Sequence, residues 1–279
     1  MKRLKKFKKL IALTAVAILS IGIFAGCGAN KDSETGSIDK IKENGKIKIG
    51  VFSDKPPFGF VNEKGENDGF DVYLGKRLAK DLLGDETKVE FVLVDAASRV
   101  EFLQSNKVDV ILANFTVTPE RKEKVDFADP YMKVSLGIVS KDGKITDPEQ
   151  LKGKKLIVNK GTTADAYFTK NYKDIELVKF DHNTEAFEAL KDGRGDALAH
   201  DNTLLFAWAR ENKGFNVGVK SLGGEDTIAP AVKKGNEELL KWINEDLAKL
   251  KDEGFFKESY NATLKPVYGE EVNPEDVIF

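Results

Sequence analysis

The chain has 279 residues, of which 41% are hydrophobic and 32% are charged, with a formal net charge of −2 and a single cysteine. One cysteine excludes a fold held together by internal disulfides. A chain that is slightly acidic, and more so without its basic N-terminus, argues against a nucleic-acid partner. This length provides a core for one large domain or two small lobes.

The N-terminus is typical of a secretory signal. Six basic residues within positions 2–9 precede an apolar run, Leu10 to Phe24, which is too short to span a bilayer comfortably. Ala25-Gly26-Cys27 follows and resembles a bacterial lipoprotein cleavage site. We predict a signal peptide over 1–26, lipidation of Cys27 and a tether over 27–39, which would hold the protein on the extracytoplasmic face of the cell membrane. The alternative is a signal anchor with an incidental cysteine. Removal of the six positive charges takes the net charge from −2 to −8.

Strands and helices are predicted to alternate through the first half of the mature chain. The strand at 46–51 is followed by a turn near 63–69, a helix capped by Asp71 and running to Leu83, and a strand at 88–94. A helix at 98–106 precedes an apolar strand at 108–112. This alternation predicts an α/β sheet that is at least partly parallel.

The second half repeats this plan. Strands are predicted at 134–139, 156–159 and 227–232, and helices at 149–152, after Thr162, at 203–210 and at 236–251. Lys107–Thr116 resembles Arg194–Thr203: each has a basic residue, an Asp, a short apolar strand and a polar loop. Two lobes of similar plan would explain the repeat. Ligands of open α/β sheets lie beyond the carboxyl ends of the strands, so we expect loops 52–60, 114–121, 160–163 and 200–203 to meet at one cleft.

The segment Ile111–Arg121 has the groups that a carboxylate needs. Arg121 offers a planar fork of donors, Thr116 a hydroxyl, and Pro119 suits the first position of a helix, where N–H groups are free. An arginine on a solvated helix face is the alternative. Asp201, just past an apolar strand, can pair with an ammonium or cap the next helix. An arginine facing an aspartate is what an α-amino acid requires.

Several motifs together resemble one known family. They are Gly69-Phe70-Asp71, Val108-Asp109, Thr116–Arg121, Phe127–Tyr131, Lys160–Thr163 and Gly195–Asp201. Over residues 40–265 the chain resembles the extracellular solute-binding proteins of polar amino-acid ABC importers, the type II periplasmic binding proteins of cluster three. The resemblance implies two α/β lobes joined by two crossing strands, near 133–136 and 225–228, with the ligand cleft between them. Lobe 1 would comprise 40–134 and 227–279, and lobe 2 would comprise 135–226.

The resemblance also implies roles for individual residues. Arg121 would hold the α-carboxylate with Thr116 and the N–H groups of Thr162 and Thr163. Thr162 and Asp165 have capping-box spacing, so Thr162 can instead serve only as a helix cap. Asp201 would hold the α-ammonium together with a carbonyl near Asn114. Arg99 and His200 lie where acidic-ligand and glutamine-binding members, respectively, contact the ligand side chain.

The ligand's side chain is expected to be small and uncharged, with cysteine as the first choice. Basic-ligand members carry an Asp where this chain has Phe52 and a stacking aromatic where it has Lys55, which counts against lysine or arginine. Segments 50–59, 95–103 and 201–208 are most similar to the cysteine-binding branch. A free Arg99 would allow an acidic ligand, whereas pairing with Glu101 or Asp95 would favour a small soft group.

The remaining expectations concern the pocket wall and the function. Phe52, Phe60 and Phe115 are candidates for an apolar lining or for the core. We expect a monomer that delivers its amino acid to an ABC permease, without catalytic residues, metal or cofactor. An enzyme that dehydrates a cyclic amino-acid precursor and a surface adhesin or sensory subunit are the alternatives. An enzyme needs a poised proton donor, and His182 and His200 are the only histidines.

Overall fold

The computed structural model describes residues 37–270 and 272–279. The predicted signal peptide, Cys27 and most of the tether lie outside these residues. The described chain begins with a helix that was not predicted, α1 (Ile38–Asn44), which Ser37 caps by accepting a hydrogen bond from the N–H of Lys40. Within the described part, no helix is long and apolar enough to cross a membrane.

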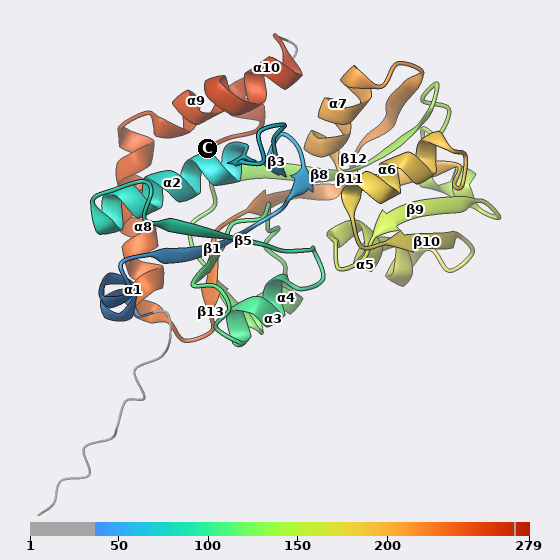
Figure 1. Cartoon of the computed structure of the whole chain (residues 1–279). Coiled ribbons are helices and arrows are strands. Elements are labelled where there is room, and N and C mark those ends of the chain that lie inside the picture. The colour runs from blue at the N-terminus through green and yellow to red at the C-terminus, as the bar shows by residue number, and fades with distance from the viewer. Residues whose placement is uncertain (1–36, 271) are drawn as a thin grey trace, which may run out of the picture. The chain divides into compact units, whose positions relative to one another are not determined.

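The first lobe is built on a mixed five-stranded sheet in the order β5-β1-β6-β13-β7. Its strands are β1 (Ile47–Val51), β5 (Val89–Leu93), β6 (Val110–Ile111), β13 (Ala231–Lys233) and β7 (Val125–Phe127). β1 pairs in parallel with β5 and β6, while β13 is antiparallel to its neighbours. The helices of this lobe are α2 (Phe70–Leu83), α3 (Arg99–Gln104), α4 (Pro119–Lys122), α8 (Glu237–Asp252), α9 (Phe255–Ser259) and α10 (Lys265–Tyr268) (Figure 1).

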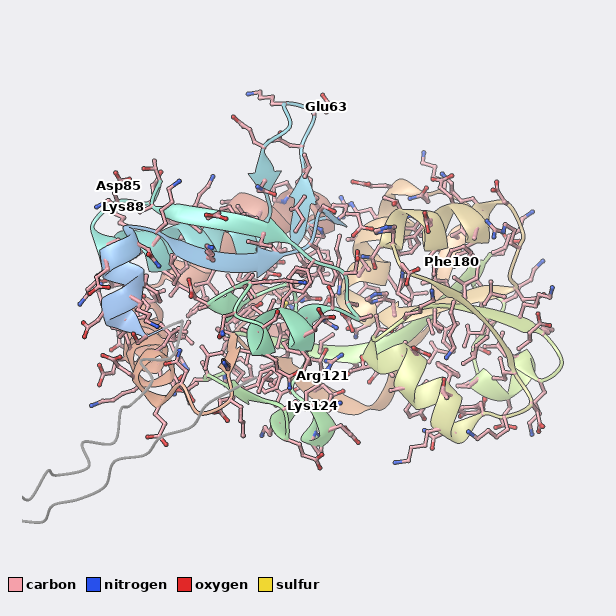
Figure 2. All side chains as sticks on the ribbon, turned by 60° about the horizontal axis from the view of Figure 1, so that its bottom comes forward. Glu63, Asp85, Lys88, Arg121, Lys124 and Phe180 are labelled. Atoms are coloured by element: carbon pink, nitrogen blue, oxygen red, sulfur yellow. The ribbon has the colours of Figure 1, made fainter. Side chains whose placement is uncertain are left out.

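A small second sheet extends from this lobe, formed by β2 (Asp54–Lys55), β3 (Gly59–Val61) and β4 (Asn67–Asp68). The turn predicted near 63–69 joins β3 to β4, and Figure 2 shows Glu63 at its projecting tip. This small sheet positions Lys55, at the end of β2, next to the strand ends of the main sheet.

The second lobe has its own five-stranded sheet, in the order β10-β9-β11-β8-β12. The strands are β8 (Met132–Lys141), β9 (Lys155–Asn159), β10 (Glu176–Phe180), β11 (Ala197–Asp201) and β12 (Phe215–Ile228). A short 3-10 helix (Pro148–Leu151) and the helices α5 (Thr163–Asn171), α6 (Asn183–Lys191) and α7 (Asn202–Glu211) complete it. Two sheets of similar plan confirm the predicted two-lobe α/β fold.

Two long strands connect the lobes. β8 and β12 pair antiparallel from Met132 with Ile228 to Lys141 with Phe215, with register shifts between. The predicted crossings at 133–136 and 225–228 fall on the part of this ribbon next to the first lobe, where Thr116 also forms a bridge to Ile228. The predicted lobe boundaries at 134/135 and 226/227 stay predictions.

The repeat seen in the sequence has a structural counterpart. Asp109 accepts a hydrogen bond from the backbone N–H of Lys48 at 2.8 Å, and Asp196 accepts one from the N–H of Lys155 at 2.9 Å. In each lobe the aspartate before a strand therefore fixes the start of the neighbouring parallel strand.

Asp71 does not cap α2, contrary to the prediction. The helix begins at Phe70 after Gly69, whose φ of 111° and close approach to the carbonyl of Phe58 leave no room for a Cβ. Asp71 is instead buried and accepts hydrogen bonds from the Tyr131 hydroxyl at 2.6 Å and from the Asn114 N–H at 2.7 Å. Burial raises the pKa of Asp71 to about 6, although both hydrogen bonds oppose the shift. The carboxyl thus anchors the loop that carries Asn114.

Candidate ligand-binding site

Loops from both lobes enclose a cavity of about 10 Å³. This volume is close to the roughly 10–15 Å³ that a single water needs. It is lined by Phe52, Lys55, Arg99, Asn114, Thr116, Arg121, Thr162, Thr163, His200 and Asp201. All the predicted site residues except Phe115 therefore come together, and Lys55, which was not predicted, joins them. The lobes are closed on a space too small for an amino acid.

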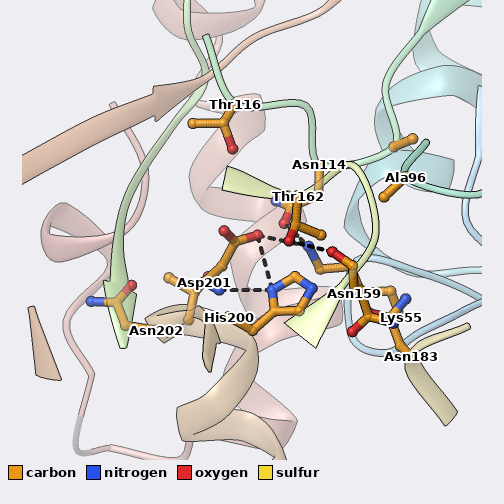
Figure 3. Close-up of polar contacts among 12 residues, drawn as sticks. Lys55, Ala96, Asn114, Thr116, Asn159, Thr162, Asn183, His200, Asp201 and Asn202 are labelled. Carbon is orange, nitrogen blue, oxygen red and sulfur yellow. Dashed lines mark hydrogen bonds and ion pairs between the residues drawn. The ribbon is translucent and has the colours of Figure 1, made fainter. Parts of the chain in front are cut away.

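An ion pair between Lys55 and Asp201 occupies the centre of this site. The Lys55 ammonium lies 2.7 Å from Asp201 Oδ2 and donates to Asn114 Oδ1 at 2.6 Å (Figure 3). Both side chains are buried, with 2% and 6% of their surface exposed. Burial lowers the pKa of Lys55, and the charge of Asp201 opposes that shift. Because Lys55 belongs to the first lobe and Asp201 ends β11 in the second, the pair also joins the lobes.

Asp201 is held as a carboxylate. Burial alone would raise its pKa, but the charge of Lys55, which donates to its carboxylate, brings it well below its usual range. Asp201 occupies the N-cap position of α7 without a side-chain capping bond, so the alternative role as a helix cap is wrong.

His200 is a neutral hydrogen-bond acceptor towards Asp201. The backbone N–H of Asp201 donates to His200 Nδ1 at 2.7 Å, so this nitrogen carries no proton and the imidazole holds its proton on Nε2. Burial lowers the pKa of His200, which agrees with the neutral form. The 3.5 Å separation between Nδ1 and Asp201 Oδ2 is therefore not an ion pair.

Arg121 reaches into the cavity from the start of α4. Its guanidinium donates to the carbonyl of Thr116 at 2.6 Å and to the carbonyl of Gly161, in the second lobe, at 2.9 Å. It also lies over the ring of Phe115, 4.6 Å from the centroid. Burial lowers the pKa of Arg121 to about 10, so it remains charged at neutral pH. The alternative of a solvated helix-face arginine does not describe this geometry.

Arg99 is neither free nor paired with an acidic side chain, so both predicted possibilities are wrong. Its guanidinium donates to backbone carbonyls, at 3.0 Å to Ala96, 3.1 Å to Ala113 and 3.3 Å to Gly161. The two proposed acidic partners bind elsewhere, Glu101 to a lysine and Asp95 to a histidine. Burial, and next the charge of Arg121, lower the pKa of Arg99. Carbonyl oxygens and aromatic rings stabilise its positive charge.

The three candidate aromatic residues have different positions. Phe52 lines the cavity, and its ring centroid lies 5.5 Å from the Arg99 guanidinium. Phe115 is buried beneath Arg99 and Arg121, at 4.4 and 4.6 Å, and supports both without lining the cavity. Phe60 is half-buried in the β3 strand and does not line the cavity, so its predicted lining role is wrong.

The N-terminus of α5 supplies fewer free donors than expected. Thr162 caps the helix: its hydroxyl accepts from the N–H of Asp165 at 3.2 Å and donates to the carbonyl of Asn159 at 2.7 Å. The backbone N–H of Thr162 also bonds to Asn159. Of the two predicted backbone donors, only the N–H of Thr163 has no partner among the described residues.

Contacts outside the cavity also hold the lobes together. Asp54 accepts hydrogen bonds from the N–H and side-chain amide of Asn183, at 2.6 and 3.0 Å, at the start of α6. His182 Nδ1 lies 3.1 Å from Asp95. A Cβ on Gly161 would approach the Cα of Ala97, across the cleft, to 2.6 Å. Closure therefore involves hydrogen bonds and close backbone packing at the rim.

Residues 47–265 match the family of bacterial extracellular solute-binding proteins, family 3. The chain belongs to this family. Among residues 37–270 and 272–279, no cluster of His, Cys, Asp or Glu has the arrangement of a metal site.

Two solved structures and one relative by sequence extend the comparison. The L-cysteine solute receptor of Neisseria gonorrhoeae is 61% identical and has a TM-score of 0.86, over 87% of this chain and 99% of that one. The cysteine-binding protein of Campylobacter jejuni is 60% identical, also with a TM-score of 0.86, over 87% of this chain and 98% of that one. The ABC transporter glutamine-binding protein GlnH of Bacillus subtilis is 38% identical, over 92% of this chain and 98% of its own length. These similarities confirm the type II periplasmic-binding-protein fold.

Proposed function

We propose that this solute-binding protein captures free cysteine between its lobes and delivers it to an ABC importer. The observation that carries the proposal is the Lys55–Asp201 pair. The carboxylate expected to bind an amino acid's ammonium already binds an ammonium of the chain itself through Oδ2, at 2.7 Å, and that ammonium also donates to Asn114 Oδ1 at 2.6 Å. The site is thus built to accept an ammonium beside the Arg121 guanidinium.

The proposed roles follow from this arrangement. Asp201 binds the α-ammonium, while Arg121, Thr116 and the N–H of Thr163 bind the α-carboxylate. A planar guanidinium matches a carboxylate with two parallel hydrogen bonds. Phe52 and the neutral His200 border the space left for the ligand's side chain.

Cysteine is favoured over glutamine by similarity and by size. The two cysteine-binding structures are 61% and 60% identical to this chain, whereas the glutamine-binding relative is 38% identical. Phe52 and Arg99, whose guanidinium is held by backbone carbonyls, line the cavity. They leave little room for a ligand side chain next to the groups that bind the ligand's ammonium and carboxylate. A small side chain needs the least rearrangement.

A binding role is favoured over catalysis. The cavity's histidine is neutral and donates no proton through Nδ1, and Asp201 is a carboxylate held by Lys55. Neither is a poised acid of the kind a dehydratase needs. An adhesin or sensory role would require a further partner, and we propose instead that the partner is the permease of an importer and that the protein acts as a monomer.

We further propose that lipid on Cys27 tethers the protein to the outer face of the membrane. The Ala25-Gly26-Cys27 sequence after an apolar run supports this. Cys27→Ala should release the protein from the membrane fraction or leave it unprocessed. Processed Cys27→Ala protein that remains in the membrane fraction would contradict lipid attachment.

A thermal-shift screen against the standard amino acids tests the ligand. Cysteine should give the largest rise in Tm, because a ligand that binds only the folded state stabilises it by mass action. Arg121→Ala should abolish the rise, while Lys122→Ala, on the same helix with an exposed side chain, should retain it. A larger rise with glutamine would make glutamine the ligand.

A further inference from the structure

The cavity has more positive than negative charge. Its cations are the side chains of Lys55, Arg99 and Arg121, and His200 is neutral. The carboxylates inside are Asp201 in the wall and Asp71 behind Asn114. Asp226, on β12, is close enough for its charge to act on Arg121, but it is exposed and does not line the cavity. Even with Asp71 ionised, one positive charge remains in excess inside the cavity, and an amino acid with one ammonium and one carboxylate does not change this balance. Uncompensated buried charge is unfavourable.

Lys55 can remain in the site when a ligand binds. A lysine ammonium has three donors, of which one is used by Asn114 Oδ1 and one by Asp201 Oδ2. No described residue donates to Asp201 Oδ1, so this oxygen is open to a second ammonium. Asp201 can therefore hold the ligand's ammonium on Oδ1 and Lys55 on Oδ2.

The aromatic surroundings of Lys55 also stabilise its positive charge in the buried position. Its side chain is buried, and its ammonium lies 5.3 Å from the ring centroid of Phe52 and 5.7 Å from that of Phe58. The faces of aromatic rings attract cations. Among the described residues Lys55 donates only to Asn114 and Asp201, so its third donor is available to a ligand atom, for which an anionic partner is best.

We infer that Lys55 faces the ligand's side chain and that cysteine is bound as its thiolate. This rests on the proposed function. On binding, the S–H bond breaks, sulfur keeps the electron pair, and the proton leaves to solvent. No covalent bond forms and no electron is transferred. The thiolate neutralises the excess positive charge, which the hydroxyl of serine and the amide of glutamine cannot do.

The chemistry of the thiol makes this step accessible. A cysteine thiol has an ordinary pKa of about 8.5, and nearby Lys and Arg lower it by one or more units. Lys55 is therefore a specificity-determining residue: its charge selects a side chain that ionises near neutral pH.

Calorimetric titration of the wild-type protein with cysteine and with serine tests the inference. Each titration is run in two buffers of different ionisation enthalpy, which gives the number of protons released. Cysteine should release close to one proton at pH 7 and bind up to about tenfold tighter per pH unit between pH 6 and 8, because only the deprotonated form is held. Serine should release none. Ultraviolet difference spectra should show thiolate absorption only with cysteine.

Substitutions assign the effect to Lys55. Lys55→Met should reduce the proton release and lower the preference for cysteine over serine at least tenfold. Lys55→Arg keeps the charge and should keep the preference. Lys64→Met, on the exposed turn of the same small sheet, should behave as wild type. If Lys55→Met does not fold, proton release and the preference for cysteine over serine in the wild-type and Lys55→Arg proteins still test whether cysteine binds as its thiolate.

The outcomes separate this inference from the proposed function. Tight cysteine binding without proton release or thiolate absorption overturns the inference alone. Equal proton release with serine also overturns it, because the proton would then come from the protein and not from the thiol. Failure of cysteine to bind, with another amino acid binding instead, overturns the proposed function.

Discussion

The two walls of the cavity differ in charge. The first lobe contributes three cations, Lys55, Arg99 and Arg121, whereas the second contributes the carboxylate of Asp201 and the carbonyl of Gly161. When the lobes are apart, the polar groups of each wall are exposed to water. When the lobes close, the cations of one wall meet the acceptors of the other. In the closed structure the Lys55–Asp201 pair and the hydrogen bonds to the carbonyl of Gly161 connect the two walls. A ligand with both charges can take part in these contacts and so favour the closed state.

The largest expected effect comes from removing a cation from the first wall. Arg121→Ala should weaken cysteine binding by roughly 2–5 kcal/mol, the range for truncating one partner of a buried charged pair. Calorimetry measures the loss, with Lys122→Ala as the matched control. An affinity within a few-fold of wild type, with the fold intact, would show that Arg121 does not hold the carboxylate.

A second test prevents the walls from meeting without changing any charge. Gly161→Ala places a Cβ 2.6 Å from the Ala97 backbone across the cleft, and it also strains a φ of +73°. Gly153→Ala has the same strain, at φ +71°, but nothing within 4 Å of its Cβ. Gly161→Ala should cost about 1–3 kcal/mol of binding through overpacking, and Gly153→Ala almost none. Equal affinities in the two variants would contradict closure at this contact.

A smaller effect is expected at the rim, away from the cavity. Asp54→Ala removes the hydrogen bonds to the start of α6, and we expect a loss of about 1–2 kcal/mol, typical of a helix cap or a charged hydrogen bond. The loss should appear as faster ligand release in stopped-flow measurements. Glu66→Ala, on the turn of the same small sheet, is the control. Unchanged release rates would show that the rim contact of Asp54 does not help to keep the lobes closed.

The smallest expected effect separates folding from closing. Asp246 lies on α8 and does not line the cavity. Burial, and next the negative charge of Asp81, raise the pKa of Asp246 from 3.8 to about 7. The folded state therefore binds this proton more tightly than the unfolded state, and the stability it contributes falls as pH rises through this range.

Asp246→Asn should remove this dependence and stabilise the fold at pH 8. We expect a gain on the order of 1 kcal/mol in urea unfolding, because Arg77 and Lys249 already offset part of the repulsion. Ligand affinity should not change. A variant that is less stable than wild type at pH 8 would show that Lys249 and Arg77 stabilise the ionised carboxyl by more than Asp81 destabilises it.

The positions of Arg121, Thr116 and Asp201 in the two walls could be predicted from the sequence, because they depend on local sequence patterns. The strand, loop and helix start at 111–121 placed Arg121 and Thr116, and the repeat of that plan placed Asp201. These inferences depend on short-range spacing and on the tendency of ligands to bind at strand ends.

Lys55 could not be predicted in the same way. It lies in a short strand of a side sheet, and its partner Asp201 is 146 residues away in the other lobe, so the pair exists only when the lobes are closed. For Arg99 the sequence leaves open a free guanidinium or one paired with an acidic side chain, because backbone carbonyl partners depend on the fold. In the structure its partners are the carbonyls of Ala96, Ala113 and Gly161. Asp71 has the residue type of a cap, but Gly69 takes that place because only glycine fits against Phe58.

The most direct test of the account is calorimetric titration of the purified protein with cysteine, serine, glutamine, glutamate and arginine under one set of conditions. Cysteine should bind most tightly, since its side chain is smaller than those of glutamine, glutamate and arginine and, unlike that of serine, can neutralise the excess cation as a thiolate. Binding of glutamine, glutamate or arginine at least tenfold tighter than cysteine would contradict the account.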